Sequence, residues 1–143
     1  MEGHPNGTAH QGTVIAIRGS VVDARFAQPL PALYHVLRAG DQQHIVIEVI
    51  THLDVVTVRG IALTSTRGLA RGSAIVDTGQ PLQVPVGRRV LGRVFDVFGA
   101  TIDGQPALTG GEWRSIHRQP VPLAQQATTT EVFETGIKAI DLL

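Results

Sequence analysis

Apolar and polar residues alternate in short bursts over the first 84 positions. Val22, Ala24 and Phe26 share one face of an extended segment, while Asp23 and Arg25 share the other. A period of two residues is that of a β-strand with one buried face. The pattern predicts seven short strands, at 13–18, 21–26, 32–37, 44–50, 55–63, 74–77 and 82–86.

The turns between these segments indicate how the strands connect. Gly19-Ser20 is a two-residue turn that begins with glycine, which favours a tight hairpin between the first two strands. Many short strands separated by turn signals are typical of a small closed barrel or a sandwich. We favour an all-β barrel, because closure removes the exposed strand edges of so short a chain.

The period changes after Pro85. Apolar residues now recur on the neighbouring rows of one helix face, at Val90, Leu91, Val94, Phe95 and Phe98. We expect a short helix here that ends at Gly99, since glycine is common just after the end of a helix.

The chain divides into three parts on these patterns. Residues 1–12 lack the features of a secretory signal and are expected to be a disordered lead. Residues 13–84 are expected to form a β-barrel domain, and residues 85–143 the incomplete start of a second domain. An apolar rhythm resumes from Glu131 and the chain stops within it at Leu143, so we expect an engineered truncation.

Composition argues against several classes of function. Twelve basic residues balance 12 acidic ones, and a formal net charge of +0 disfavours a nucleic-acid-binding surface. The chain has no cysteine, which excludes a disulfide, a thiolate nucleophile and a Cys-ligated zinc site within it. No apolar run approaches the roughly 20 residues of a membrane-spanning helix, so we expect no direct membrane insertion.

Common catalytic motifs do not occur. The phosphate-binding loop Gly-x-x-x-x-Gly-Lys-Ser/Thr is absent, and no serine lies in a nucleophile elbow. The six histidines lack the spacing of a zinc site, so exposed or hydrogen-bonded histidines are expected. The aspartates are scattered and are expected to be solvated carboxylates: Asp23, Asp54, Asp77, Asp96, Asp103 and Asp141.

Three smaller features have competing interpretations. Arg88, Arg89 and Arg93 could bind phosphate or an acidic partner, but we favour a solvated helix face. Trp113, the single tryptophan, is expected to pack against other residues. The spacing of Thr128-x-x-Glu131 fits a helix capping box.

Three longer motifs resemble a known family. They are Pro85-Val-Gly-x-x-x-Leu-Gly-Arg-Val-x-x-Val-x-Gly99, Trp113-x-x-Ile-His-Arg118 and Glu134-Thr-Gly-Ile-Lys-Ala-Ile-Asp-Leu142. In this order, and with the hairpin sequence at 12–23, they are similar to the β subunit of F-type ATP synthase over residues 12–143. The motif residues are expected to serve structure and assembly rather than catalysis: Gly87, Leu91, Gly92, Arg93, Trp113, His117, Arg118, Glu134, Thr135, Gly136, Lys138 and Asp141.

The resemblance implies a six-stranded N-terminal barrel, followed by the incomplete start of an α/β P-loop nucleotide-binding domain. The barrel would hold an alternating α3β3 ring together at its crown, with α-type subunits and a central stalk subunit as partners. In the intact proton- or sodium-translocating ATP synthase, ATP or ADP and Mg²⁺ would bind through residues beyond position 143. The chain alone is expected to bind no cofactor or metal and to catalyse nothing. The complex would lie peripherally on the cytoplasmic face of the bacterial inner membrane.

Paralogous subunits are the main alternatives. The α subunit has a similar barrel and a related Thr-Gly-Ile-Lys motif, and vacuolar-type and flagellar-export ATPases share the plan more distantly. Glu134 and the segment 113–118 favour β over α. A non-enzymatic barrel for single-stranded nucleic acid or oligosaccharide is the remaining alternative. Six aromatic residues and zero net charge disfavour it, because such barrels present stacking platforms beside a basic groove.

Overall fold

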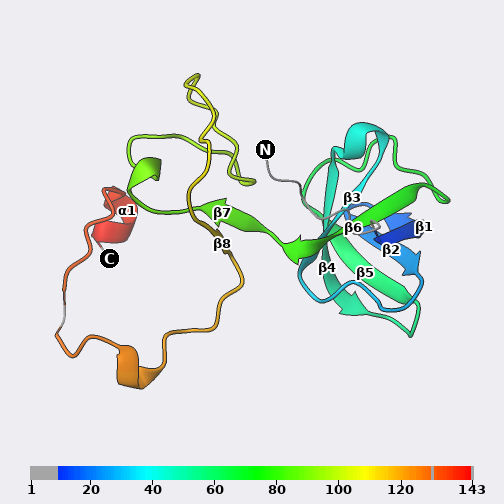
Figure 1. Ribbon diagram of the computed structural model, residues 1–143, viewed down its shortest axis with the longest axis horizontal. Coiled ribbons are helices and arrows are strands. Elements are labelled where there is room, and N and C mark those ends of the chain that lie inside the picture. Colours follow the sequence, from blue (N-terminus) through cyan, green and yellow to red (C-terminus); the bar gives the residue numbers. More distant parts are fainter. Residues whose placement is uncertain (1–9, 130, 143) are drawn as a thin grey trace.

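The computed structural model describes residues 10–129 and 131–142, which form a small β-barrel and an extended arm from residue 83 onward (Figure 1). The barrel contains β1 (His10–Arg18), β2 (Val21–Phe26), β3 (His35–Ala39), the 3₁₀ turn η1 (Asp41–Gln43), β4 (Ile45–His52), β5 (Thr57–Ala62) and β6 (Ala74–Pro81). The arm contains β7 (Gln83–Pro85), η2 (Arg88–Val90), β8 (Trp113–Ser115), η3 (Leu123–Gln125) and the single α-helical turn α1 (Lys138–Asp141).

The six barrel strands close on themselves in the order β1-β2-β5-β4-β3-β6, and every neighbouring pair is antiparallel. The predicted closed barrel is therefore confirmed. Gly19 forms the turn between β1 and β2 with φ +63°, a conformation that glycine adopts without steric cost. The predicted hairpin is also confirmed, since Arg18 pairs with Val21 directly across this turn.

The barrel interior is a single apolar core. Val22, Ala24 and Phe26 of β2 are all buried in it, as their alternation predicts. They pack with aliphatic residues from the other five strands, among them Val14, Leu37, Ile47, Val58 and Ile75. Each fully buried side chain of this size contributes roughly 1.5–3 kcal/mol relative to an exposed one, so this core is the main source of the barrel's stability.

Several strand boundaries differ from the predicted ones. Strand β1 begins at His10, which pairs with Asp77, so residues 10–12 are not part of a disordered lead; residues 1–9 of that lead lie outside the described residues. Strand β3 begins at His35 rather than at 32, because Tyr34 adopts a left-handed conformation with φ +68° that no strand continues through. Strand β5 begins at Thr57, after a turn in which the Asp54 carboxylate accepts from the Val56 N–H.

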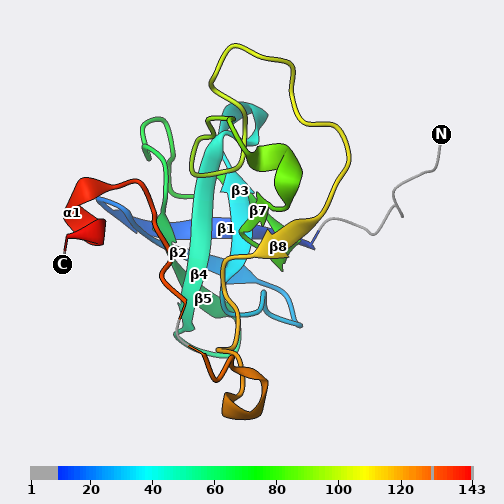
Figure 2. The same cartoon turned by 90° about the vertical axis from the view of Figure 1, so that its left-hand side faces the viewer.

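The seventh predicted strand, 82–86, exists but does not belong to the barrel. It is β7, and it pairs with β8 to form a two-stranded ribbon, with Val84 opposite Arg114. Figure 2 shows the arm from its own side, with long loops around this ribbon. Many apolar residues of the arm are exposed, which leaves it little core of its own.

The helix predicted from the spacing of Val90, Val94 and Phe98 is wrong. Only the 3₁₀ turn η2 forms, and Gly92 follows it with φ +71°, which ends any helical course. Farther on, the Asp96 carboxylate accepts from the N–H groups of Phe98 and Ala100. Short acidic side chains that bond to nearby backbone N–H groups compete in this way with helix formation.

Candidate functional site

The 12 motif residues do not converge on one site. Gly87, Leu91, Gly92 and Arg93 lie in the loop between the ribbon strands. Trp113 belongs to the ribbon itself, and His117 and Arg118 follow it. The last five motif residues lie around α1, at the end of the arm (Figure 1).

The loop cluster is organised by Asp103. Arg93 Nε lies 2.5 Å from Asp103 Oδ2, and its Nη2 donates to Asp103 Oδ1 and to the Pro106 carbonyl. The N–H groups of Val94 and Gln105 also donate to this carboxylate. The hydrogen bonds from Arg93 hold the pKa of Asp103 well below its ordinary value.

Arg93 and Asp103 therefore do not behave as predicted from the sequence. Their side chains are only 13% and 8% exposed, so neither a solvated helix face nor a solvated carboxylate is correct here. The bidentate pair satisfies both groups, which lets them lie largely away from water. Arg93 holds the loop together and is not displayed for an anion.

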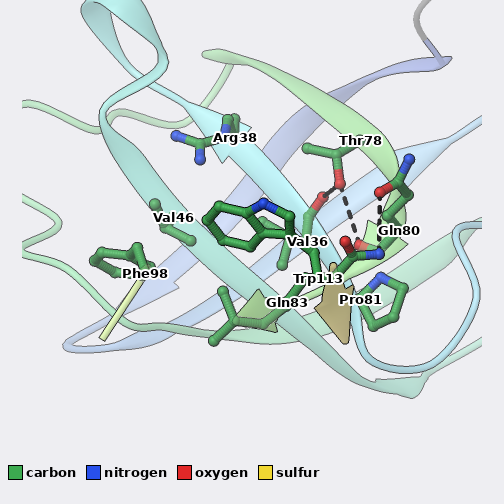
Figure 3. A pocket seen from close by; sticks show the side chains of 10 residues that line it. Val36, Arg38, Val46, Thr78, Gln80, Pro81, Gln83, Phe98 and Trp113 are labelled. Carbon is green, nitrogen blue, oxygen red and sulfur yellow. Dashed lines mark hydrogen bonds between the residues drawn. The ribbon is translucent and has the colours of Figure 1, made fainter. Parts of the chain in front are cut away.

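The second cluster joins the ribbon to the barrel. Trp113 lines a cavity of about 310 Å³ together with Val36 and Val46 of the barrel and Phe98 of the arm (Figure 3). Four residues later, His117 Nε2 lies 2.8 Å from Glu48 Oε1, and its ring stacks on Tyr34 with ring centroids 4.0 Å apart. Arg118 lines a shallow hollow beside Tyr34 and His117.

The third cluster is a local turn around Asp141. Its carboxylate accepts from the N–H groups of Thr135 and Gly136 and from the Thr135 hydroxyl at 2.7 Å. The Thr135 bonds hold the pKa of Asp141 below its ordinary value. Glu134 and Lys138 are exposed at either side of this turn. The cluster shapes the backbone and shows no convergent group aimed at a ligand.

Residues 14–79 match the model of the ATP synthase alpha/beta family, beta-barrel domain. The chain is also 52% identical, over 143 residues, to ATP synthase subunit beta 2 of Shewanella frigidimarina, a match that covers 100% of the chain. The barrel of this chain is therefore a beta-barrel domain of the ATP synthase alpha/beta family.

Other relatives of the family agree with this assignment. The chain is 58% identical over 137 residues to ATP synthase subunit beta 1 of Marinomonas sp. and 56% identical over 132 residues to ATP synthase subunit beta 2 of Albidiferax ferrireducens. Each match covers 92% of this chain. These relatives are named as β subunits, which supports the predicted choice of β over α.

The chain spans less than a third of these ATP synthase relatives. It covers 28% of the Marinomonas protein, 25% of the Albidiferax protein and 30% of the Shewanella protein. The family match lies on the barrel, and the 12 motif residues lie outside it. The similarity to the family model is therefore a similarity of the barrel.

The barrel contains an ion-pair network that the sequence pattern does not predict. Asp23 was expected to be solvated, but it is only 4% exposed. Arg59, its direct neighbour on β5, donates from Nε at 2.7 Å and from Nη2 at 2.9 Å, and Arg18 donates from β1 at 3.3 Å. Hydrogen bonding to Arg59 lowers the pKa of Asp23. The alternation did place Asp23 outside the core, but it carried no signal for the two arginines that cover it.

Asp77 also departs from the solvated-carboxylate prediction. Its side chain is only 8% exposed and lies 3.2 Å from His35 Nδ1 on the neighbouring strand β3. The prediction of hydrogen-bonded histidines is confirmed for five of the six: His10, His35, His44, His52 and His117. His4 lies outside the described residues.

Three further findings limit the chemistry of the described residues. Over 10–129 and 131–142, no group of three or more His, Cys, Asp or Glu side chains is arranged to hold a metal ion. No helix in these ranges has the length and apolar character needed to cross a membrane. The capping box proposed at Thr128–Glu131 is wrong, because no helix begins in the described residues around it.

Proposed function

We propose that this chain is the N-terminal part of a catalytic β subunit of F-type ATP synthase, and that its barrel holds neighbouring subunits together at the crown of an α3β3 ring. The observation that carries the proposal is the match of the whole chain, at 52% identity, to a relative named as a β subunit. The closed barrel supports the proposal, because every one of its strands is paired on both sides, which suits a structural role in an assembly.

The outer surface of the barrel has the character of a lateral contact. Ile50 of β4, Ile61 of β5 and Leu63 just after β5 are 39–41% exposed. Ile61 lies beside Val21 on one neighbouring strand and beside Glu48 on the other. Apolar side chains grouped on one face of a small domain are typical of a protein contact surface.

The lateral contact is tested by mixing. Adding the matching N-terminal barrel of an α subunit should raise the melting temperature of this chain, since binding to the folded state stabilises it. Ile61→Asp should abolish the increase by placing a charge in the contact. Arg25→Gln, an exposed change two pairs along β2 and β5 from Asp23 and Arg59, should preserve it. An unchanged melting temperature for the wild-type mixture would contradict the proposal.

Catalysis belongs to the complete subunit in this proposal. ATP or ADP and Mg²⁺ would bind through a phosphate loop in the remainder of the β subunit, and the central stalk would contact that remainder. The ring itself would lie peripherally on the cytoplasmic face of the membrane. The motif residues around Asp103 and Asp141 would shape the backbone that leads into the nucleotide-binding domain.

Without a phosphate loop, this chain alone should neither bind nor hydrolyse ATP. Calorimetric titration with Mg-ATP measures binding directly, and release of inorganic phosphate measures hydrolysis. Micromolar affinity for Mg-ATP would overturn this part of the proposal but would leave the lateral contact untouched.

A further inference from the structure

Two valines of the barrel are buried although they are not part of its core. Val36 of β3 and Val46 of β4 are only 5% and 4% exposed, but neither belongs to the core cluster. The inward positions on these strands are held by other residues, such as Leu37, Ile45 and Ile47. Since successive side chains of a strand point to opposite faces, Val36 and Val46 point outward. Something outside the barrel shields them from water.

The β7–β8 ribbon lies beside Val36 and Val46. Val36 and Val46 line the cavity of about 310 Å³ that also includes Leu82, Phe98 and Trp113 (Figure 3). Trp113 is held in the ribbon by the pairing of β8 with Pro85, and its ring lies close to Gly99, where an added Cβ would come within 2.7 Å of it. The outer face of β3 and β4 thus carries a small apolar contact with the arm.

A polar contact lies next to this apolar one. Glu48 is directly opposite Val36 in the β3–β4 pairing, and its carboxylate is the group that His117 approaches at 2.8 Å. The Glu48 side chain is 13% exposed, so this hydrogen bond is partly shielded from water. Tyr34 completes the contact by stacking on the histidine ring at an interplanar angle of 19°.

The backbone of Tyr34 is held in a sparsely populated conformation to make this stack. Its φ of +68° is rare for an aromatic residue, and its N–H donates to the Val49 carbonyl at 2.7 Å. Such strain persists only where surrounding contacts compensate for it. The stack with His117 and the bond to Val49 are two contacts that do so.

We propose that Tyr34, Glu48 and His117 form a latch that docks residues 113–118 onto the outer face of β3 and β4, so that barrel and ribbon move as one body. The chain between β6 and β7 is a single residue, Leu82, and covalent connection alone would let the ribbon pivot there. The latch adds a second attachment 35 residues farther along the chain, at His117. This inference does not depend on the proposed assembly with other subunits.

Two readouts report on the latch in the full chain. Trp113 is the only tryptophan, so its emission follows the ribbon. Trypsin cuts after Arg114 and Arg118, which lie within the docked segment, and cleavage there requires the segment to leave the barrel. Circular dichroism and the melting temperature report separately on the barrel.

Removing either side of the hydrogen bond should open the latch. Glu48→Ala and His117→Ala should each raise the rate of cleavage after Arg118 about tenfold and shift Trp113 emission to longer wavelength, since a partly buried hydrogen bond contributes on the order of 1.4 kcal/mol. The double variant should cleave no faster than either single variant, because the two groups act through one contact. Glu48→Gln should largely preserve the docking, since its amide oxygen still accepts from His117.

A matched control tests whether the loss of any acidic side chain has the same effect as opening the latch. Glu112→Ala removes an ion pair with Arg114, 2.6 Å long, that lies within the arm. It should leave both readouts unchanged. The proposal is overturned if His117→Ala, which lies outside the barrel, changes neither cleavage nor emission, or if Glu112→Ala changes them equally.

Discussion

Asp23 shows how a single carboxylate can tie three barrel strands together. It lies on β2, and it accepts hydrogen bonds from Arg59 of β5 and Arg18 of β1. The carboxylate is buried, whereas the Arg18 side chain is 65% exposed, so the two arginines cover the acid and remain partly hydrated themselves. Removing one partner of such a group leaves the others unsatisfied, which costs more than the pair contributes.

Neutralising this carboxylate should weaken the barrel in a pH-dependent way. Asp23→Asn should lower the free energy of unfolding by roughly 2 kcal/mol near neutral pH. The pKa of Asp23 is lower in the folded state than its ordinary value of 3.8. Its stabilisation is therefore fully present above that value and is lost as the pH falls below it.

Urea unfolding of both proteins at neutral and at strongly acidic pH measures this effect. The difference between wild type and Asp23→Asn should shrink at acidic pH, because the wild-type carboxylate is then protonated. Asp41→Asn, at an exposed position in η1, should match wild type throughout. A pH-independent difference would contradict the role given to the charge of Asp23.

At the scale of elements, the alternating sequence was sufficient to predict most of the barrel. The strands could be located because the period of two residues is set by which face is buried, and burial dominates the energy of a small sheet. The arm could not be predicted in the same way. Residues 90–98 have helical spacing but no core to pack against, so Gly92 and the Asp96 turn decide the backbone instead. Strand β8 has three residues, too few to show alternation.

One glycine marks a close approach of two strands. Gly60 is buried in the middle of β5, and an added Cβ would lie 2.6 Å from Ile47 Cγ2 and 2.7 Å from the Glu48 carbonyl oxygen. Gly60→Ala should therefore lower the free energy of unfolding by about 3 kcal/mol, because backbone atoms of β4 cannot yield without disrupting the ladder.

Gly68→Ala provides the comparison for this prediction. Gly68 has φ +83° but open space around it, so alanine there incurs only backbone strain, roughly 1 kcal/mol. Chemical denaturation of both variants measures the two costs. Equal losses would show that close strand approach is not what requires Gly60.

At the scale of the whole molecule, the structure combines a well-packed barrel with an arm that makes few contacts with it. The motif residues of the arm could be recognised as a set through their resemblance to a family, but their contacts could not be predicted. His117 and Glu48 are 69 residues apart, and nothing in either local sequence indicates the other. Such a pairing depends on where the closed barrel places β4 relative to the ribbon.

The arm should therefore detach before the barrel unfolds. Its docking depends on a few local contacts, among them the His117–Glu48 hydrogen bond and the His117–Tyr34 ring stack, whereas the barrel has a continuous core. In a urea titration, the emission of Trp113 should change at a lower midpoint than the far-ultraviolet circular dichroism of the strands. Coincident transitions would mean instead that barrel and ribbon unfold as a single cooperative unit.

Closure of the barrel has a consequence for any molecule that meets it. With β1 paired to β6, each of the six strands has a hydrogen-bonded neighbour on both sides. A neighbour cannot extend this ladder, so recognition is confined to outward side chains. Outward side chains can be substituted without changing the barrel backbone. Related copies of one barrel can therefore diverge until each binds selectively to another copy.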